Sequence, residues 1–160
     1  MPLSRGEFAF LYRSEQGVID AHRWRRAAAP LVAIFAGLTV VWLLVRPYAS
    51  RSLGERTLFD PLILATNLYR LLYGLAAILL AICWVNLAAK RFRDRARPAP
   101  VGLAGLLPLC ALCDGALRWL QPQVADILPR ASVFVGDAAV FAALIWTVAE
   151  CGDLIPKGGR

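Results

Sequence analysis

A dense block of cations separates two long apolar runs, and this block limits what the chain can fold into. Residues 90–97 read Lys-Arg-Phe-Arg-Asp-Arg-Ala-Arg, which is five cations and one carboxylate. Placing one Lys or Arg at the centre of a membrane-spanning helix costs about 2.5–3.5 kcal/mol on insertion scales. The block therefore predicts a loop outside the membrane, and the positive-inside rule predicts that this loop is cytoplasmic.

The apolar content of the chain supports a membrane protein. Hydrophobic residues make up 59% of the sequence, whereas apolar residues make up about 45–50% of a soluble domain. The net charge of +7 would suggest nucleic-acid binding in a soluble protein. Here the cations flank apolar runs, so anionic lipids are the expected partners and no nucleic acid is expected.

Four apolar runs predict an all-α membrane protein with four transmembrane helices, since about 20 apolar residues cross a bilayer. Ahead of them, residues 1–26 predict an amphipathic arm lying on the membrane surface, with a solvated, partly ordered arm as the alternative. Residues 152–160 predict a flexible tail. The expected spans cover about 27–49, 61–89, 101–120 and 131–151.

Charge counting predicts the orientation. Twelve of the 18 Lys and Arg residues fall on the arm, the central loop and the tail, and five fall on the opposite side. This bias predicts that both termini are cytoplasmic, in the inner membrane of a bacterium. The tryptophans all fall near predicted span ends, where indole rings favour the interface. They are Trp24, Trp42, Trp84, Trp119 and Trp146.

Three ionisable residues fall inside the predicted spans at similar depths. Arg70, Asp114 and Asp137 lie within about 5 Å of one another in depth at 1.5 Å rise per residue. Arg118 is an i,i+4 neighbour of Asp114 and an alternative partner for it. The four residues predict a buried polar cluster. It would serve as a structural ion pair, as a polar cavity for a small molecule or ion, or as a proton relay. In the remaining alternative, these side chains extend outward to the membrane surface and form no cluster.

Other chemical motifs are few. Cys110-Ala-Leu-Cys113 is a CxxC, but its apolar neighbours place it inside the third span, where small buried cysteines are common. His22 is the single histidine and Met1 the single methionine. A haem would lack axial ligands within the spans, and no cofactor, metal or disulfide framework is expected. No catalytic triad, P-loop or zinc-protease motif is present, which argues against common enzyme classes.

The central block has two interpretations. In the first it is a topology anchor that binds anionic lipid. In the second, Asp94 among its neighbouring arginines organises a folded loop that docks on the N-terminal arm or on a partner. The candidate docking residues are Lys90, Arg91, Arg93, Asp94, Arg95 and Arg97.

The block also carries a resemblance. Lys90-Arg91-Phe92-Arg93-Asp94 is similar to the Arg-Arg-Leu-His-Asp-like motif of the YhaH-like proteins, with Arg93 at the position of the histidine. Arg5-Gly6-Glu7-Phe8, or Gly17-Val18-Ile19 leading to Trp24, resembles that family's polar opening segment. The resemblance implies a bacterial inner-membrane domain of unknown function with about four spans, and it brings no established reaction.

These observations predict a non-enzymatic accessory or interaction subunit of a membrane complex. Its expected partners are other membrane-protein subunits or further copies of the chain. A small transporter or channel-like protein using Arg70, Asp114 and Asp137 is the alternative. A membrane thiol redox protein using Cys110 and Cys113 is the third possibility.

Overall fold

The structure, a computed structural model, describes residues 5–48, 61–125, 127 and 129–154. Within them the chain is helical and forms no strand. Two short turns accompany the helices: the π turn η1 (Ala9–Arg13) and the 3₁₀ turn η2 (Arg46–Tyr48). The helices are α1 (Arg5–Phe8), α2 (Ala21–Val45), α3 (Pro61–Asp94), α4 (Pro100–Leu120) and α5 (Ala131–Cys151).

Four helices are long and apolar enough to cross a membrane. They are α2 together with η2, α3, α4 and α5, which hold 28, 34, 21 and 21 residues. The prediction of an all-α membrane protein with four such helices is confirmed. The chain has the make-up of an integral membrane protein with several spans.

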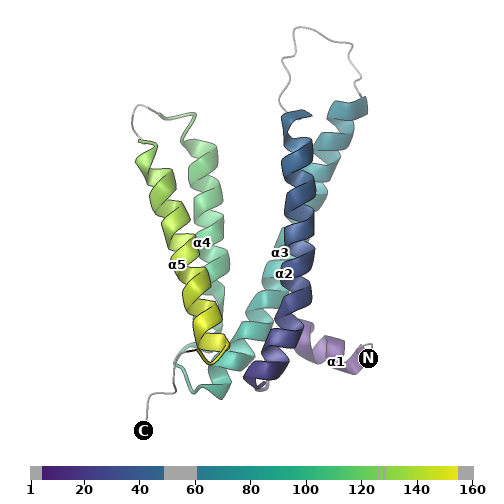
Figure 1. Ribbon diagram of the computed structural model, residues 1–160, viewed down its shortest axis with the longest axis vertical. Coiled ribbons are helices and arrows are strands. Elements are labelled where there is room, and N and C mark those ends of the chain that lie inside the picture. Colours follow the sequence, from purple (N-terminus) through teal and green to yellow (C-terminus); the bar gives the residue numbers. More distant parts are fainter. Residues whose placement is uncertain (1–4, 49–60, 126, 128, 155–160) are drawn as a thin grey trace.

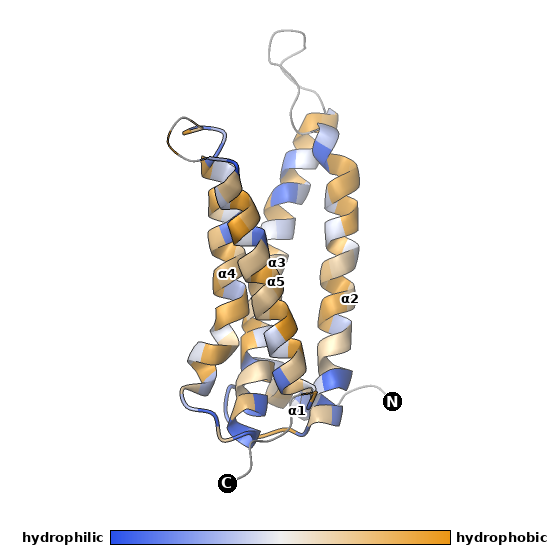
Figure 2. Ribbon diagram, turned by 60° about the vertical axis from the view of Figure 1, so that its left-hand side comes forward, coloured by the Kyte–Doolittle hydropathy of each residue, from blue (hydrophilic) through white to orange (hydrophobic). Residues whose placement is uncertain are grey.

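The long helices form two hairpins that meet at one end. The pair α2–α3 and the pair α4–α5 diverge away from the end at which both termini lie (Figure 1). We call this end the base and the opposite end the far end. The helix α3 packs against both α2 and α4. The short helix α1 lies crosswise at the base, where hydrophilic residues gather below the apolar helices (Figure 2).

Two helices are longer than the sequence suggested. The helix α3 continues past the expected end near residue 89 to Asp94, so the first half of the predicted loop at 90–97 is helical. Its 34 residues correspond to about 51 Å, against about 30 Å of hydrocarbon, so its last turns extend beyond the apolar layer. The helix α2 begins at Ala21 rather than Ala27, because the Asp20 side chain caps it by accepting from the Arg23 N–H at 3.2 Å.

The hydrophobic core lies at the base. Leu87, Ala88 and Phe92 of α3 are fully buried, and the arm contributes Leu11 and Tyr12 to the same cluster. Two ring contacts join separate elements there. Trp24 meets Trp84 edge-on with centroids 5.7 Å apart, and Phe92 stacks on Trp146 at 5.4 Å. Three of the five tryptophans therefore lie at the base, near the ends of the predicted spans, where the sequence placed them.

The turn from α3 to α4 is built on residues with positive φ. The Arg97 N–H bonds to the Phe92 carbonyl at 3.0 Å and the Ala96 N–H to the Arg93 carbonyl at 2.9 Å. This is the Schellman pattern, with Ala96 at φ 52° in the position that favours glycine. Residues 50–60, which the sequence predicts to be an outer loop, lie outside the described residues, and so do residues 155–160 of the predicted tail at 152–160.

Candidate functional site

The cations of the central block face the chain's other segments at the base. We call this group the base cluster. It joins the end of α3 to the end of α5 and to the N-terminal arm. Its members are Lys90, Arg91, Arg95, Arg97, Glu150 and Asp153.

Two arginines, one in the last turn of α3 and one just after it, cap the end of α5. The Arg91 side chain is 1% exposed, and its Nε donates to the Cys151 carbonyl at 2.9 Å while its other nitrogens pair with Asp94 and Asp153. Arg95 donates to the Glu150 carbonyl at 2.9 Å. The last carbonyls of a helix have no donor within the helix, and cations are favoured beside them. Arg91 and Arg95 therefore satisfy groups that α5 leaves open.

Glu150 is the carboxylate at the centre of the base cluster. Its side chain is 1% exposed, and Oε1 accepts from Arg95 at 2.9 Å and from Arg97 at 2.7 Å. Asp153 adds a second carboxylate, 2.8 Å from Arg95. A buried charge persists only when it is paired and hydrogen-bonded. Glu150 Oε1 meets this requirement, whereas Glu150 Oε2 is buried without a hydrogen-bond partner among the described residues.

Lys90 ties the N-terminal arm to α3. The lysine is fully buried, and Nζ donates to the Leu11 carbonyl at 3.1 Å and to the Ser14 carbonyl. One turn earlier, Asn86 donates to the Tyr12 carbonyl at 2.8 Å. The Leu11 and Tyr12 carbonyls belong to the turn η1, and Ser14 follows it directly. One cation and one amide thus hold the arm across the base.

Tyr12 fixes the arm to a second helix. Its hydroxyl donates to the Ala27 carbonyl of α2 at 3.0 Å. Burial raises the pKa of Tyr12 above its usual range, so the phenol stays protonated as a donor. The arm is therefore bonded to both α2 and α3.

The structure thus favours the second interpretation of the central block, in which it docks on the arm. Lys90, Arg91 and Arg95 turn their charges toward protein oxygens and have side chains at most 2% exposed. Arg93 donates to the Glu15 carbonyl, and Arg97 remains 45% exposed. Lipid binding by the block stays a prediction for these two outer cations.

A second group of charges lies between α4 and α5 toward the far end. We call Asp114, Arg118 and Asp137 the far-end cluster. Arg118 Nε donates to Asp114 Oδ2 at 2.8 Å, and its Nη2 donates to Asp137. A Cβ on Gly136 would lie 2.5 Å from Asp114 Oδ1, so this glycine gives the carboxylate room. The arginine is 52% exposed.

The far-end cluster unites three of the four residues predicted to pair there. Arg118, the i,i+4 alternative, is the cation that both aspartates share. Arg70 is exposed on α3 and has no ion pair with the described residues, because the two hairpins diverge toward the far end (Figure 1). Asp114 Oδ1 is buried without a hydrogen-bond partner. The cluster therefore has two carboxylates for one cation.

The cysteines carry free thiols. Cys110 and Cys113 lie three residues apart on α4, half-buried and exposed respectively, and Cys151 is buried at the base. Within the described ranges no group of three His, Cys, Asp or Glu side chains is placed to hold a metal ion. A thiol redox role for Cys110 and Cys113 stays a prediction.

Sequence reasoning missed Glu150 and Asp153 as the partners of the central block. One signal was available: Glu150 is an acid at the end of a span whose one other charged residue in the sequence is Asp137. Such a charge requires a cation nearby. The contacts of Lys90 and Arg91 with backbone carbonyls had no signal in the sequence, since any residue carries a carbonyl.

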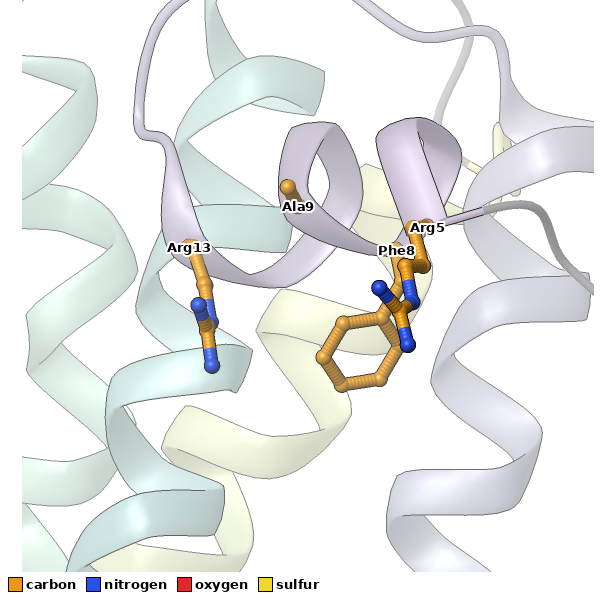
Figure 3. A pocket seen from close by; sticks show the side chains of 4 residues that line it. All are labelled: Arg5, Phe8, Ala9 and Arg13. Carbon is orange, nitrogen blue, oxygen red and sulfur yellow. The ribbon is translucent and has the colours of Figure 1, made fainter.

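A hollow of about 420 Å³ opens on the N-terminal arm, lined by Arg5, Phe8, Ala9 and Arg13 (Figure 3).

Comparison with known proteins adds no assignment to these sites. No family model, no curated protein and no solved structure matches the chain.

Proposed function

We propose that the chain is a non-enzymatic accessory or interaction subunit of a membrane complex. Its location would be the bacterial inner membrane with both termini cytoplasmic, as the distribution of Lys and Arg predicts. The observation that carries the proposal is Arg70, an exposed arginine on an apolar helix. Membership of the YhaH-like family stays a prediction beside it.

Arg70 lies nine residues after Pro61, or about 14 Å along α3 from its start. It makes no ion pair with the described residues. Ionisable groups at membrane depth pair with one another or mark functional positions. An exposed arginine at this depth that forms no ion pair within the described part of the chain therefore supports a carboxylate supplied by a partner helix.

The surroundings of Arg70 suit a helix–helix contact. Asn67 lies three residues earlier and is also exposed, so the two polar groups share one side of α3. Leu64, Leu68 and Leu71 beside them are 67%, 55% and 72% exposed. Only 6 to 17% of the most apolar window of each long helix is buried by the chain itself. Much apolar surface is therefore open to lipid or to a partner.

The test is purification from the native membrane in a mild detergent, with wild type beside Arg70→Leu and Arg46→Leu. Arg46 is the matched control, since it is also an exposed arginine toward the far end. We expect a stoichiometric partner, or a second copy, to be retained by wild type and by Arg46→Leu and lost with Arg70→Leu. A lone chain in wild type, or equal retention by all three, would contradict the proposal.

A small transporter or channel-like protein is the second candidate, and Asp114 favours it. The unpaired Asp114 Oδ1 and the surplus carboxylate are features of a site for a cation or a proton. The test is thermal unfolding in detergent over a series of Na⁺, K⁺ and pH. Ion-dependent stabilisation that disappears with Asp114→Asn and persists with Glu15→Gln would support it. A stabilisation equal in all three proteins would reject it.

A further inference from the structure

We propose that Arg5, Phe8 and Arg13 form a binding site for the headgroup phosphate of an anionic phospholipid. These residues line the hollow of about 420 Å³ on the arm. Their side chains project from the same side of α1 and η1 (Figure 3). The site is separate from Arg70 and does not depend on the proposed partner.

The spacing of the residues explains the site. Arg5, Ala9 and Arg13 follow at intervals of four, and Phe8 lies three residues after Arg5, so all four share one helical face. Ala9 has a short side chain between the two arginines, which leaves the hollow open. The adjoining face holds Leu11 and Tyr12, which are buried against the long helices, and the Tyr12 ring lies 5.0 Å from the Phe8 ring.

The arm is held in place before any ligand arrives. Lys90, Asn86 and Tyr12 bond it to α3 and α2, as described above. A ligand at Arg5 and Arg13 therefore meets two cations already fixed on one scaffold. Such preorganisation lowers the entropic cost of binding.

The charges of the hollow select an anion. Its lining carries two arginines and no carboxylate. Neither Arg5 nor Arg13 forms an ion pair with a described residue, whereas the nearby Arg23 lies 3.7 Å from Glu7 and over the Phe10 ring. Two unneutralised guanidinium groups facing one hollow suit phosphate oxygens.

The apolar part of the hollow selects a lipid over a soluble phosphate. Phe8 is 47% exposed although it is a large aromatic side chain. The arm lies crosswise at the base, beside the lower ends of the apolar helices α2 and α3 (Figure 1). An exposed ring between cations at this level matches an interfacial segment, with the ring toward acyl chains and guanidinium groups toward headgroups.

The experiment is native mass spectrometry of the full chain in detergent, titrated with dioleoylphosphatidylglycerol. The variants are Arg5→Gln/Arg13→Gln and the matched control Arg25→Gln/Arg26→Gln, which removes two exposed arginines of α2. We expect the first lipid to bind about 30-fold more weakly to the arm variant, at about 1 kcal/mol per cation. The control should change by less than about threefold, since the first lipid avoids α2.

Two further titrations distinguish an anionic lipid from other ligands. Dioleoylphosphatidylcholine should bind more weakly than phosphatidylglycerol and should not distinguish the variants. Inorganic phosphate should not displace the lipid, and displacement would make this a soluble-anion site and overturn the proposal. Equal losses in both double variants, or no loss in either, would also overturn it. Matching far-ultraviolet circular dichroism confirms that the variants are folded.

Discussion

The base cluster and the far-end cluster contain the same chemistry in opposite settings. Both pair arginine with carboxylates from more than one segment of the chain. At the base, Arg91 and Glu150 are each 1% exposed, and the cations also cap backbone carbonyls. At the far end, Arg118 is 52% exposed and is the cation that pairs with both Asp114 and Asp137.

The difference shows which charges hold the fold together. The base cluster joins three separate parts of the chain, namely the arm, the end of α3 and the end of α5. The far-end cluster joins only α4 and α5, which already pack along their length. We therefore expect the base cluster to determine stability and the far-end cluster to be available for other roles.

The largest expected effect separates the two clusters through their carboxylates. Glu150→Ala leaves Arg95 and Arg97 without their shared acceptor, and breaking a buried pair costs about 3–5 kcal/mol. Asp137→Ala removes a one-third exposed partner of Arg118, for which polar contacts between membrane helices suggest about 1 kcal/mol. In detergent, the unfolding temperature of Glu150→Ala should be well below that of Asp137→Ala. The reverse order would contradict the comparison.

The second effect concerns the link between the arm and α3. Lys90→Met keeps the length and apolar character of the side chain but loses the bonds to Leu11 and Ser14. Leaving buried carbonyls without a donor costs about 1–3 kcal/mol. Limited proteolysis should cut the arm faster in this variant, with α4 and α5 unchanged. Arg130→Met, an exposed control, should be cut at the wild-type rate.

The third effect tests the surplus charge at the far end. Arg118→Leu leaves two carboxylates without a cation, and it should lower the unfolding temperature by the equivalent of about 1–2 kcal/mol. Adding Asp114→Asn and Asp137→Asn removes the stranded charges, so the triple variant should regain most of that loss. Losses that add from one substitution to the next would show that the three residues act independently.

The smallest effect lies at the turn that follows the base cluster. Ala96 has φ 52°, and glycine relieves the strain of this conformation. Ala96→Gly should stabilise the protein by about 1 kcal/mol. Ala111→Gly on an exposed face of α4 should instead destabilise it by about 0.5–1 kcal/mol, since glycine weakens a helix interior. If both substitutions changed the unfolding temperature equally and in the same direction, Ala96 would not be strained by its positive φ.

The sequence predicted the helices better than it predicted their contacts. Four apolar runs marked α2 to α5, because a spanning helix needs a long apolar stretch whatever its neighbours are. The predicted second span ends at residue 89, whereas the helix α3 continues to Asp94, because a helix keeps its backbone hydrogen bonds beyond the apolar layer. Depth placed Arg70 beside Asp114 and Asp137, but depth says nothing about lateral separation.

The base cluster shows the other limit of sequence reasoning. Glu150 and Asp153 lie 53 or more residues from their arginines. Their pairing depends on how the hairpins meet, which no local pattern encodes. The pairing of Arg118 with Asp114 was foreseen as an alternative, because i,i+4 neighbours on a helix meet whatever the tertiary fold is.

The most direct test of the base cluster as the structural centre is unfolding of Arg91→Leu in a neutral detergent free of anionic lipid. Arg118→Leu is the matched control from the other cluster. If Arg91 acts by capping α5 and pairing with Asp94 and Asp153, its variant unfolds at a clearly lower temperature than both wild type and Arg118→Leu without any lipid. An unchanged unfolding temperature, with a difference that emerges only after phosphatidylglycerol is added, would contradict this account and return the central block to the role of a lipid anchor.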